Sequence, residues 1–411
     1  MKSENDAGGH GFRTILVATA LAGAAGYVIQ ALAGWGLEPE GYAAFGVFWA
    51  TLYLLVGAVA GIQQEIARAS RPAAASRPLG DTRRLLRFGA IAALVVASTV
   101  VASAVVWAPP VLGDDWAMAL PPLVVGATAY VGFATLTGVL YGRRRWGLLA
   151  ALIIADPVLR LVAVAAALTT GSRVLLEWAI VAPIPLTLAL GLALILLRRQ
   201  SPTAVDRSVR VLLANAARTV LGAAAMAVLI SALPLFIAAG SVHESAADIG
   251  AVIFNVTVTR APLVIPVLAF QGWLVVHFRD RSDWAAGVTR LLSAIGAAGL
   301  LLSVLAWLFV PPVLAAMFGA GYALDPWLTA GIVATSTLTA ALSASGAIVV
   351  ARGGHSAYLF GWATAALLTV ICLFLPIDLT TRLLVALAVG PAVGLGIHIA
   401  YLVSQARNSR L

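Results

Sequence analysis

The chain has 411 residues, of which 61% are hydrophobic and 10% are charged, and its mean hydropathy is +0.99. Soluble domains contain about 45–50% apolar and about 25% charged residues, so this composition excludes a water-soluble protein. The formal charge of +9 comes from basic residues that lie in loops between apolar runs, not on one water-facing element, which argues against nucleic acid as a partner.

Apolar runs bounded by charged residues, Gly or Pro predict twelve membrane-spanning helices, since one span takes roughly 20 residues. In chain order these runs are Thr14–Gly34, Tyr42–Gln63, Phe88–Ala108, Trp116–Gly142, Trp146–Leu168, Trp178–Leu197, Val211–Ala239, Ile249–Phe278, Leu291–Val310, Trp327–Val350, Tyr358–Leu375 and Leu383–Val403. The runs do not alternate with polar residues, which excludes a transmembrane barrel. The sequence therefore predicts an all-α, polytopic membrane protein.

The basic residues predict the orientation of the chain. With a cytoplasmic amino terminus, 21 of the 26 Lys and Arg residues fall in cytoplasmic segments, whereas only Arg173 and Arg382 fall in outer loops. Lys and Arg are retained on the cytoplasmic side of a membrane, where they also attract anionic lipid head groups. We therefore expect a multi-pass protein of the cytoplasmic membrane with both termini in the cytoplasm.

Three sequence features recur about two hundred residues apart, in the same order. They are an acid at a helix start (Glu40 and Asp248), a Pro-Pro pair predicted to form a turn (Pro109-Pro110 and Pro311-Pro312), and an Arg after the following span (Arg143 and Arg352). These pairs favour a duplication into an N-terminal six-helix lobe, residues 1–205, and a C-terminal six-helix lobe, residues 206–411. Because six is even, the two copies would have the same orientation in the membrane. The alternative is that such features recur by chance.

Four charged side chains fall within predicted spans, where a charge costs on the order of 2.5–3.5 kcal/mol unless it faces a cavity or a partner. They are Asp156, Arg160, Arg218 and Arg260. Asp156 lies four residues before Arg160, on the same helix face. Structural explanations exist for each residue: a neutralised Asp156–Arg160 pair, an interfacial anchor at Arg218, and an Arg260 that binds carbonyl groups freed by Pro262.

The functional interpretation takes these residues together. Guanidinium groups from both halves would line a central water-filled cleft, and guanidinium suits bidentate contact with phosphate, so we expect an anionic substrate. Asn215 and Asn255, three and five residues before Arg218 and Arg260, are further candidate substrate-binding residues. Asp156 is the candidate for coupling to H+ or Na+.

Two further groups of polar residues in spans favour packing. The tenth span carries six Ser and Thr residues between positions 335 and 345, which are typical of close helix contacts. His398 stands alone in the last span and is also expected to pack.

The sequence contains no signature of an enzyme. Lys2 is the only lysine, so no nucleotide-binding phosphate loop is possible. There is no His-Glu-x-x-His run, and the single cysteine, Cys372, lies in an apolar run. We expect no enzymatic activity, no cofactor and no metal.

Three short stretches carry a family resemblance. They are the opening pair of spans, from Gly26-Tyr27 through Leu37-Glu38-Pro-Glu40-Gly41-Tyr42 to Gly61-Ile-Gln-Gln64; Asp248-Ile-Gly250 followed by Arg260-Ala-Pro262; and Met317-Phe318-Gly319-Ala-Gly-Tyr322. Together they resemble the polysaccharide and lipid-linked oligosaccharide flippases of the multidrug/oligosaccharidyl-lipid/polysaccharide (MOP) exporter superfamily.

The resemblance implies two lobes that rock about a central cleft and carry a polyprenyl-pyrophosphate-linked saccharide, or another anionic lipid, to the outer leaflet for cell-envelope polysaccharide biosynthesis. Arg160, Arg218 and Arg260 would hold the pyrophosphate or an acidic sugar. Two alternatives stay open. One is a cation or drug antiporter of the MATE type, from the same superfamily; the other is a major-facilitator transporter, suggested by Gly80-Asp81-Thr-Arg83-Arg84.

Overall fold

The computed structural model describes residues 2–72, 80–197, 203–205, 208–241, 243–279 and 283–408, and within them the chain is helical apart from two short strands. The helices are α1 (Lys2–Gly36), α2 (Pro39–Ala69), α3 (Gly80–Leu112), α4 (Trp116–Gly142), α5 (Trp146–Leu168), α6 (Arg173–Val181), α7 (Pro183–Leu197), α8 (Val209–Ile230), α9 (Leu233–Gly240), α10 (Ala246–Arg279), α11 (Trp284–Phe318), the 3-10 helix η1 (Ala320–Tyr322), α12 (Pro326–Ala351), α13 (His355–Leu373) and α14 (Leu379–Asn408). The strands β1 (Ser70–Pro72) and β2 (Thr203–Val205) pair antiparallel. The predicted helical architecture is confirmed.

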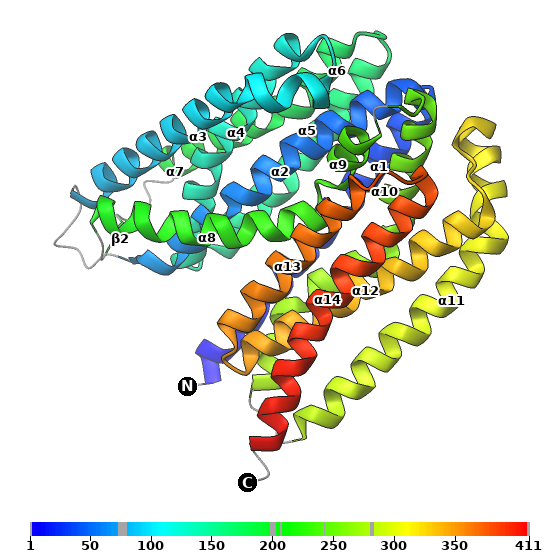
Figure 1. The fold of residues 1–411 in the computed structure, drawn as a ribbon. Helices are drawn as coiled ribbons and strands as arrows, with labels where there is room; N and C mark the ends of the chain where they lie inside the picture. Colours follow the sequence, from blue (N-terminus) through cyan, green and yellow to red (C-terminus); the bar gives the residue numbers. More distant parts are fainter. Residues whose placement is uncertain are drawn as a thin grey trace. The chain divides into compact units, whose positions relative to one another are not determined.

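The chain forms two compact units, whose helices are shown in Figure 1. Unit 1 comprises Met1–Gly36 and Val47–Ala227, and unit 2 comprises Leu37–Gly46 and Val228–Leu411. The start of α2 therefore belongs to unit 2, although the rest of this helix belongs to unit 1. The duplication into lobes 1–205 and 206–411 stays a prediction.

Unit 1 is built from long helices that pack side by side. α1 packs against α5, α3 packs against α4, and α4 and α5 both contact α6 and α7. Gly138 and Gly142 lie four residues apart on one face of α4, where added Cβ atoms would lie 2.8 Å from Gln63 O and 2.6 Å from Ser70 O. Small residues at this spacing let membrane helices approach closely, so α4 lies directly against the end of α2.

Helix α12 is the centre of unit 2, since it packs against α10, α11, α13 and α14 (Figure 1). Its buried hydroxyl groups donate to carbonyls of the same helix, as Ser336 does to Ile332 at 2.6 Å and Ser343 to Thr339 at 2.8 Å. Hydroxyls satisfied in this way fit among apolar neighbours. The predicted packing role of this polar stretch is therefore supported.

Within the described ranges, eleven helices are long and apolar enough to cross a membrane. The spans Trp116–Gly142 and Trp146–Leu168 agree with the prediction at both ends. The predicted span Ile249–Phe278 lies within α10, which is not among these eleven; some of its side chains fall outside the described part of the chain, and its crossing of the membrane stays a prediction. The chain is a multi-pass membrane protein.

Two of the predicted spans are interrupted, which the sequence analysis missed. The span Trp178–Leu197 consists of parts of α6 and α7, and Val211–Ala239 consists of parts of α8 and α9. Pro183 begins α7, and Pro234 lies in the first turn of α9. Proline lacks an N–H and is tolerated at the first turn of a helix, so each interruption precedes a proline.

The Pro-Pro pairs do not form turns, contrary to the prediction. Pro109-Pro110 lies inside α3, and Pro311-Pro312 lies inside α11. Membrane helices tolerate prolines because neighbouring groups satisfy the freed carbonyls. The chain turns later, at Gly113 (φ 77°) and Gly319 (φ 96°), where a positive φ favours glycine.

Two arginines assigned to outer loops instead lie in helices. Arg173 begins α6 and donates to Glu177 Oε1 at 3.0 Å. Arg382 lies in the first turns of α14, is buried, and donates to Ser241 Oγ at 2.8 Å. Just before it, Asp378 caps α14 by accepting from Thr381 N, and this hydrogen bond lowers the pKa of the Asp378 carboxyl. Both arginines therefore hold helix ends in place.

Helices α2 and α8 cross in close contact within unit 1. An added Cβ at Gly61 would lie 2.5 Å from the backbone N of Val220, and one at Gly57 would lie 2.6 Å from Ala227 Cβ. Thr219 Oγ1 donates to Gly61 O at 2.8 Å. The two glycines therefore allow an approach of the helix axes that a side chain would prevent.

Gly61→Ala is expected to lower the free energy of unfolding by about 1–3 kcal/mol, because α8 must move away from α2. Thermal unfolding of the purified protein in detergent measures this loss. The matched control is Gly23→Ala in α1, where nothing lies within 4 Å of the added Cβ. It should stabilise the helix by about 0.5–1 kcal/mol. Equal effects of the two variants would contradict the close crossing.

Candidate functional site

The Asp156–Arg160 pair predicted from the sequence is present on α5. Arg160 Nη2 donates to both carboxylate oxygens of Asp156 at 2.7 Å, and Nη1 donates to the hydroxyl of Tyr53 on α2. The guanidinium carbon lies 5.9 Å from the ring centroid of Trp49 and 5.4 Å from that of Tyr53, and the two rings stack at 4.7 Å. The side chain of Arg160 is 3% exposed and that of Asp156 is 22% exposed.

These contacts balance the charge of Arg160 within unit 1. A buried ion pair is tolerated when further hydrogen bonds satisfy its remaining donors, and the two aromatic faces add a favourable interaction with the cation. An incoming anion would have to compete with Asp156 for the guanidinium. Asp156 is the more exposed partner of the pair.

Arg260 is a buried arginine of unit 2, as Arg160 is of unit 1. Its side chain is buried on α10, and Nη2 donates to Thr339 Oγ1 on α12 at 3.3 Å. Arg260 lies 14 residues after Ala246 and 19 residues before Arg279, the ends of α10. At about 1.5 Å per residue these separations are about 21 Å and about 29 Å. Arg260 therefore lies in the middle part of α10, far from both of its ends.

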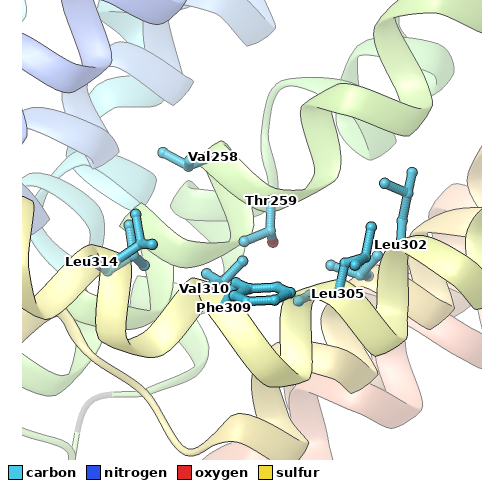
Figure 2. Close-up of a pocket in the computed structure, with 10 residues that line it drawn as sticks. Val258, Thr259, Leu302, Leu305, Phe309, Val310 and Leu314 are labelled. Atoms are coloured by element: carbon cyan, nitrogen blue, oxygen red, sulfur yellow. The ribbon is translucent and has the colours of Figure 1, made fainter.

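An apolar pocket of about 360 Å³ is formed by α10, α11 and α12 in unit 2. Figure 2 shows Val258 and Thr259 of α10 across the pocket from α11 side chains that include Leu305 and Phe309. The hydroxyl of Thr259 donates to the carbonyl of Asn255 in its own helix at 2.7 Å. The walls of the pocket are therefore apolar. Arg260 follows the lining residue Thr259 directly in the sequence of α10.

Sequence reasoning missed Glu65, a buried carboxylate in unit 1. Glu65 is 2% exposed and accepts a hydrogen bond from Nδ2 of Asn215 on α8 at 3.0 Å. It was overlooked because the predicted span ended at Gln63, whereas α2 continues to Ala69. The spacing of Gly57, Gly61 and Glu65 could have revealed this burial, because residues four apart share a helix face. α8 covers that face of α2.

The predicted residue Asn215 therefore meets a carboxylate of the protein rather than an open surface. Arg218 lies on the same helix, but its side chain falls outside the described part of the chain. Substrate contacts of both residues stay predictions.

The segments that carry the family resemblance meet in unit 2. Their aromatic rings form a cluster of Tyr42, Phe45, Phe254, Phe318 and Tyr322, with neighbouring centroids 4.7–6.4 Å apart. Tyr322 donates its hydroxyl to Leu37 O at 2.7 Å, and burial raises the pKa of this hydroxyl. Three motifs that are far apart in the sequence thus join α2, α10 and η1 at one point.

Asn255 belongs to this junction. Its Nδ2 donates to Tyr322 O and to Ala251 O, both at 2.8 Å, and the side chain is fully buried. The amide therefore holds η1 against α10. A contact of Asn255 with substrate stays a prediction.

His398 of α14 is also buried in unit 2. Its Nδ1 lies 2.9 Å from Ser345 Oγ on α12, and its ring stacks parallel to Tyr358 on α13. This histidine joins three helices, in line with its predicted packing role. Among the residues that the structure describes, no group of three or more His, Cys, Asp or Glu side chains is arranged to hold a metal ion.

Solved structures with a similar fold are transporters of the MOP superfamily. An inward-facing multidrug-resistance MATE family transporter matches with a TM-score of 0.71 at 14% identity, over 95% of this chain and 96% of the other. An outward-facing one matches with a TM-score of 0.65 at 16% identity, over 97% and 96%. A MOP superfamily transporter from Pyrococcus furiosus, described as having a binding pocket of reverse polarity that suggests a different function, matches with a TM-score of 0.58 at 15% identity, over 97% and 95%. The fold is therefore that of the MATE transporters of the MOP superfamily.

In sequence, the chain matches mycobacterial proteins over most of its length. It is 35% identical over 399 residues to the uncharacterised protein Rv3630 of Mycobacterium tuberculosis and over 401 residues to the uncharacterised protein Rv1510, and each match covers 94% of this chain and 90% of the relative. The uncharacterised protein Mb3654 of Mycobacterium bovis is equally similar. The chain belongs to the family that these proteins form. No protein-family model matches it.

Proposed function

We propose that the protein is a membrane transporter that carries a lipid-linked saccharide, or a related anionic glycolipid, from the inner to the outer leaflet of the cytoplasmic membrane. The observation that supports this most directly is Arg260, a buried guanidinium in the middle part of α10, a helix that the sequence predicts to span the membrane. Charged groups at this depth are expensive and mark substrate or ion pathways. A permanent positive charge suited to phosphate favours an anionic passenger.

The proposal assigns roles to residues of both units. Arg260 and Arg218 would bind the pyrophosphate or an acidic sugar, with Asn215 and Asn255 beside them. Arg160 would join them only when Asp156 is protonated or bound to a cation, since the two side chains otherwise bind each other. Asp156 is therefore proposed as the site of coupling to H+ or Na+. In this proposal both termini lie in the cytoplasm. The binding site opens to each side of the membrane in turn, which moves the head group across.

Binding pockets of different polarity occur on the MOP fold. The Pyrococcus furiosus transporter is described as having a binding pocket of reverse polarity, which suggests a different function for that protein. A buried arginine in α10 is the feature that favours an anion here.

A MATE-type cation antiporter is the second candidate. It is favoured by the partly exposed carboxylate of Asp156 next to the stacked rings of Trp49 and Tyr53. A carboxylate and an aromatic face are the groups that attract an organic cation. The similar MATE structures also agree with this candidate, whereas the MOP fold gives no support to a major-facilitator transporter.

Reconstitution into liposomes distinguishes the two candidates. We expect translocation of a fluorescent polyprenyl-pyrophosphate-linked sugar, detected by a quencher that acts only on the outer leaflet. Ethidium, a cationic dye, should not move along an imposed pH gradient in the same liposomes. Ethidium movement without lipid translocation would replace the proposed function with the antiporter.

A further inference from the structure

We infer that the apolar pocket between α10, α11 and α12 binds the hydrocarbon tail of the lipid-linked substrate. This inference rests on the proposed function and adds to it the place where the tail is held. The pocket has a volume of about 360 Å³, and its lining includes Val258 of α10, Leu302 of α11 and Val333 of α12 (Figure 2). Ligand pockets commonly have volumes of about 300–1,000 Å³.

The chemistry of the lining selects hydrocarbon. Among the ten lining residues that the structure describes, only Thr259 carries a polar side chain, and its hydroxyl is bonded to a carbonyl of α10. A water molecule needs two to four polar partners, which these walls do not offer. An empty pocket would forfeit dispersion contacts on all sides. A flexible apolar chain therefore fits the pocket better than water or a void does.

The pocket is accessible from the lipid-facing side of α11. Leu305, Phe309 and Val313 line it and are 40%, 57% and 46% exposed, whereas Ala306 and Leu314 are buried at its base. The exposed lining side chains of α11 mark the opening through which a chain would enter the pocket from the bilayer.

The neighbouring arginine identifies the tail as that of a transported lipid. Arg260 directly follows Thr259, and its partner Thr339 lies six residues beyond Val333 on α12, about 9 Å along the helix. A resident phospholipid keeps its phosphate at the membrane surface. A lipid whose phosphate contacts Arg260 has left that depth, and its tail then lies beside the pocket.

Photo-crosslinking tests the inference. The full chain is placed in nanodiscs of phosphatidylcholine with undecaprenyl phosphate that carries a diazirine on its tail. We expect crosslinks in the α11 segment 302–314. Val313→Trp, which fills the pocket entrance, should reduce them about tenfold. The matched control is Val304→Trp, also on α11 and 49% exposed but outside the lining, which should leave the crosslinks unchanged.

Two outcomes would overturn the inference. One is unchanged labelling of segment 302–314 in Val313→Trp. The other is equal labelling by phosphatidylglycerol with the same diazirine, which would make the pocket a site for resident phospholipid. In either case the proposed function survives if the liposomes still translocate the polyprenyl-linked sugar. Absence of that translocation, with crosslinks intact, would overturn the function and leave a lipid-binding pocket.

Discussion

Asp156→Asn is expected to lower the free energy of unfolding by about 3 kcal/mol, near the lower end of the roughly 3–5 kcal/mol for breaking a buried ion pair. The variant leaves the guanidinium of Arg160, which is 3% exposed, without its carboxylate. The hydroxyl of Tyr53 and the two aromatic rings remain, but they do not neutralise the charge. Reversible unfolding in mixed detergent micelles measures the loss.

The double variant Asp156→Asn with Arg160→Met separates the lost pair from general damage to α5. Replacing both partners by groups of similar size is often nearly neutral, so the double variant should regain most of the stability. Arg290→Gln is the control, and because Arg290 is exposed on α11 its loss should cost less than about 1 kcal/mol. A single variant Asp156→Asn that is as stable as Arg290→Gln would contradict the balanced pair.

Arg260→Ala is expected to reduce lipid translocation about a hundredfold, because truncating a buried charged partner costs about 2–5 kcal/mol in binding. Arg260→Lys should recover only part of the rate, since an ammonium group cannot bind phosphate in a bidentate manner. The measurement is the liposome assay with the polyprenyl-linked sugar, normalised to the amount of folded protein.

Arg290→Ala is the matched control for this prediction. Arg290 is exposed on α11, so its loss should leave translocation unchanged. Equal rates for wild type, Arg260→Ala and Arg290→Ala would reduce Arg260 to a structural link between α10 and α12.

The sequence predicted those parts of the structure that depend on local spacing. The Arg143–Arg145 cluster separates two apolar runs, and α4 and α5 end and begin on either side of it. Asp156 and Arg160 are four residues apart on one helix, so their contact follows from helix geometry alone. Both features can be predicted without knowing which helices pack around them.

Features that depend on distant helices were missed. The partners of Arg160 lie on α2, where Tyr53 is 107 positions earlier in the sequence. Glu65 was overlooked because the predicted span ended at Gln63, whereas α8 covers this carboxylate and Asn215 donates to it. The Pro-Pro pairs were predicted to form turns because proline disrupts helices in water-soluble proteins. Membrane helices tolerate proline, and α3 and α11 continue through the two pairs.

The resemblance of three short motifs acquires a physical explanation in the structure. Tyr42, Phe254 and Tyr322 come from three separate motifs or their immediate flanks, and they meet in one aromatic cluster. The motifs therefore report how α2, α10 and η1 are joined. They predicted the MOP fold, whereas the substrate proposed above depends on Arg260 and its surroundings.

The most direct test of the central claim compares two lipids that differ only in the presence of a phosphate group. Native mass spectrometry of the purified chain would measure binding of undecaprenyl phosphate and of undecaprenol, to wild type and to Arg260→Gln. Hydrogen bonds to charged groups contribute about 1.5–3 kcal/mol, so wild type should prefer the phosphate by at least about tenfold, and Arg260→Gln should show no preference. Equal binding of both lipids by wild type, or an undiminished preference in Arg260→Gln, would contradict a buried arginine that binds an anionic passenger.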